Sequence, residues 1–140
     1  MSETYAGDIT PTEAWEILKT NDKAVLIDVR TEAEWAWVGQ PDLSSLNKQH
    51  LLIEWVRFPG GVPNDNFAAE VSAQHTDKTA PILFLCRSGV RSKYASIVMT
   101  EAGYETCYNV AGGFEGDHNT DKHRGTVNGW KVENLPWAQG

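Results

Sequence analysis

A short, unbroken run of apolar residues in the second half of the chain restricts the fold more than any other feature. It extends from Pro81 to Cys86 and leads through a glycine-containing loop into a segment of helical character. Continuous apolar runs of about four to eight residues are typical of strands that are buried on both faces of a parallel sheet. A second run of this kind covers Ala24 to Ile27. The two runs predict buried strands of a parallel sheet.

Helix start signals alternate with the strand signals. Thr10, Pro11 and Glu13 form a capping-box start, with Thr at the N-cap and Pro at the first helical position. The same box recurs from Thr31 to Glu34. The other expected elements are strands at 51–56 and 106–110 and helices at about 64–74 and 91–102, the last one stopped by Gly103. This alternation predicts an α/β domain with a largely parallel sheet that is flanked by helices on both faces.

The composition fits one folded domain and disfavours two classes of partner. The chain has 140 residues, of which 41% are hydrophobic and 22% are charged, a balance typical of globular proteins. We expect a single domain over residues 8–140, with residues 117–140 as an appended C-terminal cover. The formal net charge of −7 disfavours general binding to nucleic acids or anionic membranes, because such binding requires clustered cations.

The cysteine count and the lack of targeting signals predict a cytoplasmic protein. Cys86 and Cys107 could form at most one disulfide, so the chain is not a disulfide framework. No apolar run approaches the roughly 20 residues that cross a bilayer, and residues 1–5 lack the basic and apolar regions of a secretory signal. In the reducing cytoplasm a free cysteine remains a thiol.

The loop after the strongest strand signal combines a cysteine with groups that attract anions. Ligands of parallel sheets bind beyond the carboxyl ends of the strands, and Cys86 lies at such an end. The N–H groups at the start of the next helix have no partner within the helix, and the helix dipole adds positive charge there. Arg87, Arg91 and Lys93 add three cations, with no acid between positions 86 and 93. These effects favour a nucleophilic thiolate. The alternative, an inert buried cysteine, is disfavoured by the polar turn at Gly89.

Three motifs resemble the rhodanese family of sulfurtransferases. The stretch 86–92 resembles the active-site loop of that family. The stretch 26–30, with two acidic residues behind it, resembles its first-strand signature, and 109–114 resembles its last-strand signature of a glycine pair and an aromatic residue. The motifs follow the family's order and span residues 26–114. The chain is therefore similar to a single-domain rhodanese, and the resemblance implies a rhodanese-like α/β fold.

The resemblance also implies a thiosulfate sulfurtransferase that carries sulfur on Cys86. Rhodaneses take a sulfane sulfur from a donor such as thiosulfate onto this cysteine as a persulfide, and pass it to cyanide or to a thiol acceptor. The loop N–H groups would stabilise the persulfide, while Arg87 and Arg91 would orient the small anionic donor. No metal and no organic cofactor is implied, because the protein itself carries the sulfur. The implied substrate-binding residues are Arg87, Ser88, Gly89, Val90 and Arg91, with Ser92, Asp28 and Arg30 in supporting positions.

Two other functions compete with sulfur transfer. Cysteine-based phosphatases of the dual-specificity type also hold a thiolate below an anion loop, but they need an arginine six positions after the cysteine. Here position 92 is a serine and the arginine falls at 91, so the loop is one residue shorter than that pattern requires. The other alternative is a non-enzymatic rhodanese-like module that binds a partner through this loop. The intact cysteine and its flanking arginines speak against that alternative.

Residues near the loop allow both functional and structural interpretations. Asp28 and Arg30 could shape the pocket beside the cysteine, but we favour a structural ion pair of Arg30 with Glu34 or Glu32. Cys107 could resolve a persulfide, although its position within a strand indicates a packed side chain. His118 and His123 lie in a polar, acid-rich run, where metal binding would need further ligands.

Two segments carry no recognisable family motif. The stretch 43–61 lacks the short turn that rhodaneses often have after the first-strand signature. The tail carries Trp130 and Trp137, whereas Trp15, Trp35 and Trp55 fit the apolar faces of the domain. We expect the tail to pack on the domain; the alternative is that it walls one side of the Cys86 mouth and helps to select the acceptor.

Overall fold

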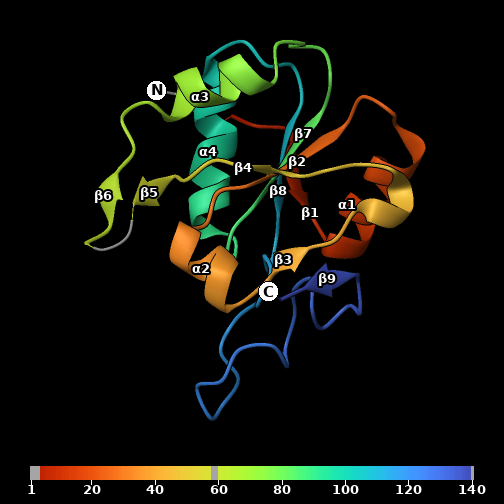
Figure 1. Cartoon of the computed structure of the whole chain (residues 1–140), viewed down its shortest axis with the longest axis vertical. Helices are drawn as coiled ribbons and strands as arrows, with labels where there is room; N and C mark the ends of the chain where they lie inside the picture. The colour runs from red at the N-terminus through yellow and green to blue at the C-terminus, as the bar shows by residue number, and fades with distance from the viewer. Residues whose placement is uncertain (1–3, 58–59, 140) are drawn as a thin grey trace.

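The computed structural model describes residues 4–57 and 60–139, and a five-stranded parallel sheet lies at its centre. The strand order is β1-β8-β7-β2-β4, and every pairing in it is parallel. The predicted α/β class is confirmed, and Figure 1 shows the strands and helices of this arrangement. Cys86 directly follows the middle strand, at the carboxyl edge of the sheet. In spatial order the strands are β1 (Gly7–Ile9), β8 (Cys107–Val110), β7 (Ile82–Leu85), β2 (Val25–Asp28) and β4 (Leu51–Leu52).

Both faces of the sheet are covered by helices or loops. Successive side chains of a strand point to opposite faces, so a central strand such as β7 contributes to two apolar clusters. Ile82 and Phe84 of β7 join an apolar cluster with α3 (Phe67–Gln74) and α4 (Val90–Glu101). Leu83 and Leu85 join a second cluster with α1 (Pro11–Thr20) and the C-terminal segment. Figure 1 shows α1 on one side of the sheet and α3 and α4 on the other. The prediction that this run is buried on both faces is therefore confirmed.

The two predicted capping boxes begin α1 and α2 (Glu32–Trp37). The Thr10 side chain accepts a hydrogen bond from the Glu13 N–H, and the Glu13 carboxylate accepts one from the Thr10 N–H. Thr31 and Glu34 form the same reciprocal pair. In each case the side chains satisfy N–H groups that a helix start leaves unpaired.

The edge strand beside β2 is shorter than the sequence predicts. The expected strand at 51–56 is reduced to β4, because β2 ends at Asp28 and the next N–H groups of that segment, of Arg30 and Thr31, donate to the side chains of Asp28 and Glu34 instead. The Asn64 side-chain amide donates to the Glu54 carbonyl at 2.8 Å, and its backbone N–H donates to the Trp55 carbonyl at 3.1 Å. The chain then turns into an antiparallel pair of β5 (Val56–Arg57) and β6 (Val62–Pro63).

Five very short elements of the described residues are absent from the sequence prediction. They are β1, a 3₁₀ turn (Ser44–Leu46), β6, and the antiparallel pair of β3 (Gln40–Pro41) and β9 (Trp137–Ala138). Segments of two or three residues show no periodicity, so their partners decide their structure. The β3–β9 pair, for example, continues in the hydrogen bond from the Asp42 N–H to the Pro136 carbonyl at 2.9 Å.

Trp130 in the C-terminal tail packs against α1. Trp130 is fully buried, its ring meets Trp15 edge to face at 6.0 Å between ring centroids, and its Nε1–H donates to the Pro136 carbonyl at 2.8 Å. The predicted extent of one domain over 8–140 stays a prediction. None of the described helices combines the length and apolar character of a membrane span.

We expect Trp130→Ala to lower the free energy of unfolding by about 3 to 5 kcal/mol, because it removes a large buried ring and leaves a cavity. Trp37 is 79% exposed, so Trp37→Ala is the matched control and should change the same quantity by less than about 0.5 kcal/mol. Urea unfolding followed by circular dichroism measures both. Equal losses in the two variants would contradict the anchoring role of Trp130.

Candidate active site

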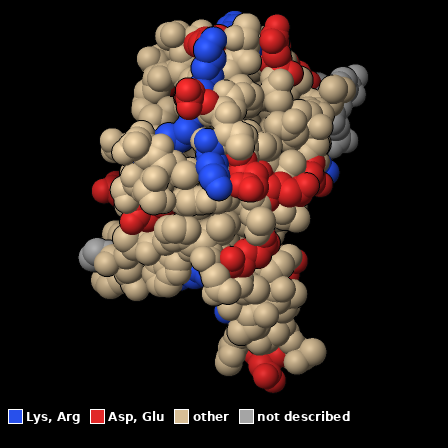
Figure 2. Space-filling view, turned by 90° about the vertical axis from the view of Figure 1, so that its right-hand side faces the viewer, with Lys and Arg blue, Asp and Glu red and all other residues tan. Residues whose placement is uncertain are grey.

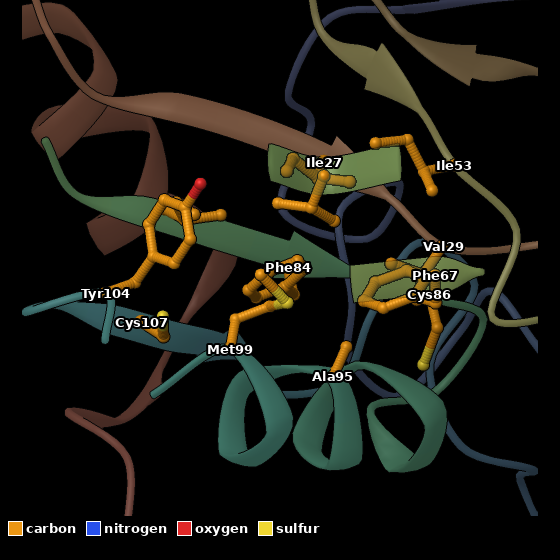
Figure 3. Packing of buried hydrophobic residues seen from close by; sticks show 12 residues of the cluster. Ile27, Val29, Ile53, Phe67, Phe84, Cys86, Ala95, Met99, Tyr104 and Cys107 are labelled. Carbon is orange, nitrogen blue, oxygen red and sulfur yellow. The ribbon is translucent and has the colours of Figure 1, made fainter. Parts of the chain in front are cut away.

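The sulfur of Cys86 lies at the start of α4. The residue is 1% exposed, and the Gly89 N–H donates to its Sγ at 3.1 Å. Figure 3 shows the sulfur directed toward the first turn of the helix. Gly89 is the N-cap and has a φ of +110°, which favours glycine over any residue with a Cβ. The polar turn therefore brings a backbone donor to the sulfur, as expected of an anion-stabilising loop.

A chain of polar side chains runs from the sulfur to the edge of the sheet. Ser92 Oγ lies 3.1 Å from Cys86 Sγ, and the Ser92 hydroxyl donates to Asn109 Oδ1 at 2.5 Å. The Asn109 amide donates to Asp8 at 3.0 Å. The sequence analysis assigned no role to Asn109. The detectable signal was a polar side chain in the middle of an otherwise apolar strand, where Asn109 is only 4% exposed.

The glycine pair after β8 supports the loop from behind. The Phe114 N–H donates to the Cys86 carbonyl at 2.8 Å, and the Trp130 N–H donates to the Gly113 carbonyl at 2.8 Å. A Cβ on Gly113 would lie 2.4 Å from the Cys86 carbonyl oxygen. The close approach of the two backbones therefore requires glycine at 113, which explains why the last-strand motif carries it.

Arg91 is held by an acidic partner from another helix. Its guanidinium donates to both carboxylate oxygens of Glu34 in α2, at 2.7 and 3.0 Å. Burial by itself would lower the pKa of Arg91, but the hydrogen bonds to Glu34 and the charges of Glu34, Cys86 and Asp28 raise it. Burial would likewise raise the pKa of Glu34, and the contacts with Arg91 outweigh it, so that pKa is lowered. The side chain of Arg91, which the resemblance implies would orient the sulfur donor, is thus held in one orientation by Glu34.

The other loop side chains are more accessible. Arg87, Val90 and Lys93 are exposed, and Ser88 is half-buried. On the face seen in Figure 2, basic and acidic side chains are interspersed, in keeping with the net charge of −7. Of the two exposed cations in the loop region, Arg87 directly follows the cysteine in the chain.

Asp28 and Arg30 form the structural ion pair that the sequence analysis favoured, but the predicted partner was wrong. Arg30 pairs with Asp28 at 2.7 Å, with both side chains fully buried, and not with Glu32 or Glu34. Arg30 also donates to the Gly39 carbonyl at 2.7 Å, and its guanidinium lies 4.3 Å from the centre of the Phe114 ring. The partner differs because Glu34 is already bound by Arg91.

Cys107 and the two loop histidines lie apart from this arrangement. Cys107 pairs in register with Ile82, at the opposite end of β7 from Cys86, and Figure 3 shows the two sulfurs at opposite ends of the cluster. Burial raises the pKa of the Cys107 thiol to about 11, against a smaller opposing effect of a Thr100 hydrogen bond. Cys107 is packed, as predicted. His118 and His123 are exposed, and no group of three His, Cys, Asp or Glu side chains in residues 4–57 and 60–139 is arranged to hold a metal.

A cavity of about 530 Å³ lies elsewhere in the molecule, and its walls include Trp35, Gln40 and His50. His50 Nε2 lies 2.9 Å from Gln40 Oε1, and burial lowers the pKa of this histidine. None of the residues that line this cavity belongs to the Cys86 loop. We place the candidate active site at Cys86, because a candidate nucleophile and a backbone hydrogen-bond donor meet there.

Comparisons with known proteins identify relatives of this chain and of its fold. The family described as "STR4 middle domain" matches residues 6–140. The crystal structure of Rv0390 from M. tuberculosis has a TM-score of 0.90 at 52% identity, over 98% of this chain and 100% of that one. The rhodanese-like domain of the Anabaena sp. protein Alr3790 has a TM-score of 0.63 at 13% identity, over 100% and 81% of the two chains. The thiosulfate sulfurtransferase GlpE of Actinobacillus pleuropneumoniae is 29% identical over 116 residues, which are 83% of this chain and 89% of that protein.

We expect Gly113→Ala to displace the Cys86 loop, because the new Cβ would overlap the Cys86 carbonyl. Gly61→Ala is a matched control: φ is +61° at Gly113 and +63° at Gly61, but no atom of the described residues lies within 4 Å of a Cβ at 61. Both variants carry the same backbone strain, of about 1 kcal/mol. Only Gly113→Ala should also slow the reaction of Cys86 with an alkylating agent or alter its final extent. Identical behaviour of the two variants would contradict the supporting role of the glycine pair.

We expect Glu34→Gln to lower the free energy of unfolding at pH 7 by about 1 to 2 kcal/mol, because it removes a half-buried, bidentate ion pair. The pKa of Glu34 is lowered from its ordinary value of 4.5, so the pair stabilises the fold above that pH. Its contribution is lost as the pH falls below 4.5 toward the lowered value. Urea unfolding against pH should show the difference from the wild-type protein shrinking in that window. Glu32→Gln, an exposed change on the same helix, is the control; a difference that persists at low pH would contradict the pairing.

Proposed function

The chain belongs to the STR4 middle domain family and to the rhodanese-like sulfurtransferases, as its motifs predicted, and we propose that it transfers a sulfane sulfur through a persulfide on Cys86. The proposed donor is a small anion such as thiosulfate, and the proposed acceptor is cyanide or a thiol. The proposal needs no metal and no organic cofactor, because the sulfur travels on the protein. It places the reaction in a reducing compartment such as the cytoplasm, where both cysteines remain free.

The proposed first step is an attack of the Cys86 thiolate on the outer sulfur of thiosulfate. A new sulfur–sulfur bond forms on Cys86, and the original bond of thiosulfate breaks with its electron pair leaving on sulfite. The enzyme then holds a persulfide anion. In the second step the acceptor attacks the outer persulfide sulfur, the Cys86–sulfur bond breaks, and the thiolate is regenerated. Thiocyanate is the product with cyanide, and a new persulfide is the product with a thiol.

The observation that supports this proposal best is the Gly89 N–H at 3.1 Å from Cys86 Sγ. It belongs to the N-cap of a 12-residue helix, so a backbone donor and the positive end of a helix dipole act on the same atom. A sulfur that carries negative charge, first as thiolate and then as persulfide, is stabilised by both. An inert buried cysteine has no need of such donors.

The cations at the site have different proposed roles. The Arg91 guanidinium is held by both carboxylate oxygens of Glu34. Its positive charge therefore acts on Cys86 from a fixed position and is partly neutralised. Arg87 directly follows Cys86 in the chain, its side chain is exposed, and it is the proposed contact for an incoming anion. With Lys93 it makes two exposed cations in the loop region, few enough to fit a small donor better than a large polyanion.

Mass spectrometry of the intact protein after thiosulfate treatment tests the proposal. We expect a gain of one sulfur atom, because thiosulfate leaves its outer sulfur on Cys86. Cys86→Ser should abolish the gain, and Cys107→Ser should retain it, since Cys107 is buried at the other end of the strand.

Two results would contradict the proposed function. One is the absence of an adduct with thiosulfate and with a second sulfane donor, under conditions where the protein is folded. The other is robust hydrolysis of an aryl phosphate that requires Cys86, which would favour the phosphatase alternative. Arg87→Ala serves as a further check: it should slow persulfide formation from thiosulfate without changing the unfolding midpoint.

A further inference from the structure

The polar chain behind Cys86 has a defined hydrogen-bond direction. Ser92 Oγ lies between Cys86 Sγ at 3.1 Å and Asn109 Oδ1 at 2.5 Å. The Asn109 Nδ2 group donates to Asp8 Oδ1 at 3.0 Å, and the Tyr5 hydroxyl donates to the same oxygen at 2.7 Å. Cys86, Ser92 and Asn109 are all buried, so water does not readily substitute for a missing partner.

Asp8 decides which way the Asn109 amide faces. A carboxylate only accepts hydrogen bonds, so the amide must turn its NH₂ group toward Asp8 and its oxygen toward Ser92. An amide oxygen cannot donate, and a serine hydroxyl carries one hydrogen. The hydrogen of Ser92 therefore points to Asn109, and a lone pair of Ser92 Oγ faces Cys86 Sγ. This arrangement accepts a hydrogen bond from a thiol.

Ionisation of Cys86 disturbs this network. A thiolate at Sγ and the lone pair of Ser92 Oγ would face each other without a hydrogen between them. Ser92 can turn its hydroxyl to the sulfur, but Asn109 Oδ1 then loses its donor in a buried place. In either case one buried acceptor is left without a partner, which is costly. The network opposes the charged sulfur, while the Gly89 N–H favours it.

We propose that Asn109 is a positioning residue that acts through Ser92 to hold the resting Cys86 as a thiol. Asp8 fixes the amide, the amide takes the hydrogen of Ser92, and Ser92 accepts from the thiol. The reaction begins when the thiol proton passes to solvent and the Ser92 hydroxyl turns to the sulfur. Ser92 then donates to the thiolate or persulfide. The catalytic role of this thiol form rests on the proposed function, whereas the hydrogen-bond network is independent of it.

Charged groups around the sulfur and behind Asn109 come from the loop and from four helices or strands, and substitution at 109 leaves them in place. The guanidinium of Arg91 is electrostatically coupled to both Cys86 and Asp28. A change at Asn109 that adds no charge therefore reports on the hydrogen bonds alone. The charged groups are Arg87 in the loop, Arg91 of α4 with Glu34 of α2, Asp28 and Arg30 at the end of β2, and Asp8 of β1 behind Asn109.

A titration of the Cys86 thiolate by its ultraviolet absorbance tests the proposal without any sulfur donor. It uses the full chain with Cys107→Ser, and the Cys86→Ser, Cys107→Ser protein is the blank. Asn109→Leu removes the acceptor at similar volume, so Ser92 is free to donate to the sulfur. We expect the pH of half-ionisation to fall by about half to one unit. Asn109→Asp keeps an acceptor and adds charge, so it should not lower this pH.

A second comparison measures the effect of Asn109→Leu on the pH of half-ionisation in a protein that also carries Ser92→Ala. It distinguishes an action of Asn109 through Ser92 from a general loosening of the site. Without the hydroxyl, Asn109→Leu should leave the titration unchanged, since Asn109 acts only through Ser92. Urea unfolding establishes that each variant is folded, and Asn109→Ala replaces the leucine variant if that one is not. An unchanged or raised half-ionisation pH in Asn109→Leu would overturn the proposal. So would a fall of equal size in the Ser92→Ala protein. Because no sulfur is transferred, a failure of persulfide formation would count against the proposed function alone.

Discussion

The hydrogen bond from the Phe114 N–H to the Cys86 carbonyl is the contact on which the rest of the site depends. It joins the end of the middle strand to the turn after β8, and only a glycine at 113 allows the two backbones so close. The same turn is held by the Trp130 N–H, and Trp130 is itself buried against α1. The position of the Cys86 backbone therefore depends on packing near the C-terminal end of the chain, where Trp130 lies.

The charges around the sulfur are balanced more closely than the local sequence indicates. Arg87, Arg91 and Lys93 within eight residues suggest a strongly positive loop. Arg91, however, forms hydrogen bonds to both carboxylate oxygens of Glu34. Arg30 likewise forms a fully buried ion pair with Asp28. A partner that is distant in sequence thus neutralises the half-buried cation of the loop region, while Arg87 and Lys93 stay exposed. The group that contacts the sulfur directly is the Gly89 N–H, an oriented backbone donor that needs little reorganisation when charge develops.

The sequence predicted those features that depend on local pattern. The run from Pro81 to Cys86 indicated a doubly buried strand, and the boxes at Thr10 and Thr31 located two helix starts, because each signal is complete within a few residues. The partner of Arg30 and the early end of β4 could not be predicted in this way. Both depend on competition between hydrogen-bond partners: Glu34 is bound by Arg91, and the Arg30 and Thr31 N–H groups donate to side chains rather than to a longer β4. Local patterns carry no information about such competition.

Asn109 shows the same limit within the site. A buried polar residue in a strand is a visible signal, since it must find partners, but its sequence neighbours do not name them. The partners come from β1 on one side and α4 on the other, so the parallel order β1-β8-β7 is what brings Asp8 and Ser92 to the same amide. This order also explains why an edge strand of three residues matters. Without β1 the Asn109 amide would be free to turn, and the Ser92 hydroxyl would have no fixed direction at the sulfur.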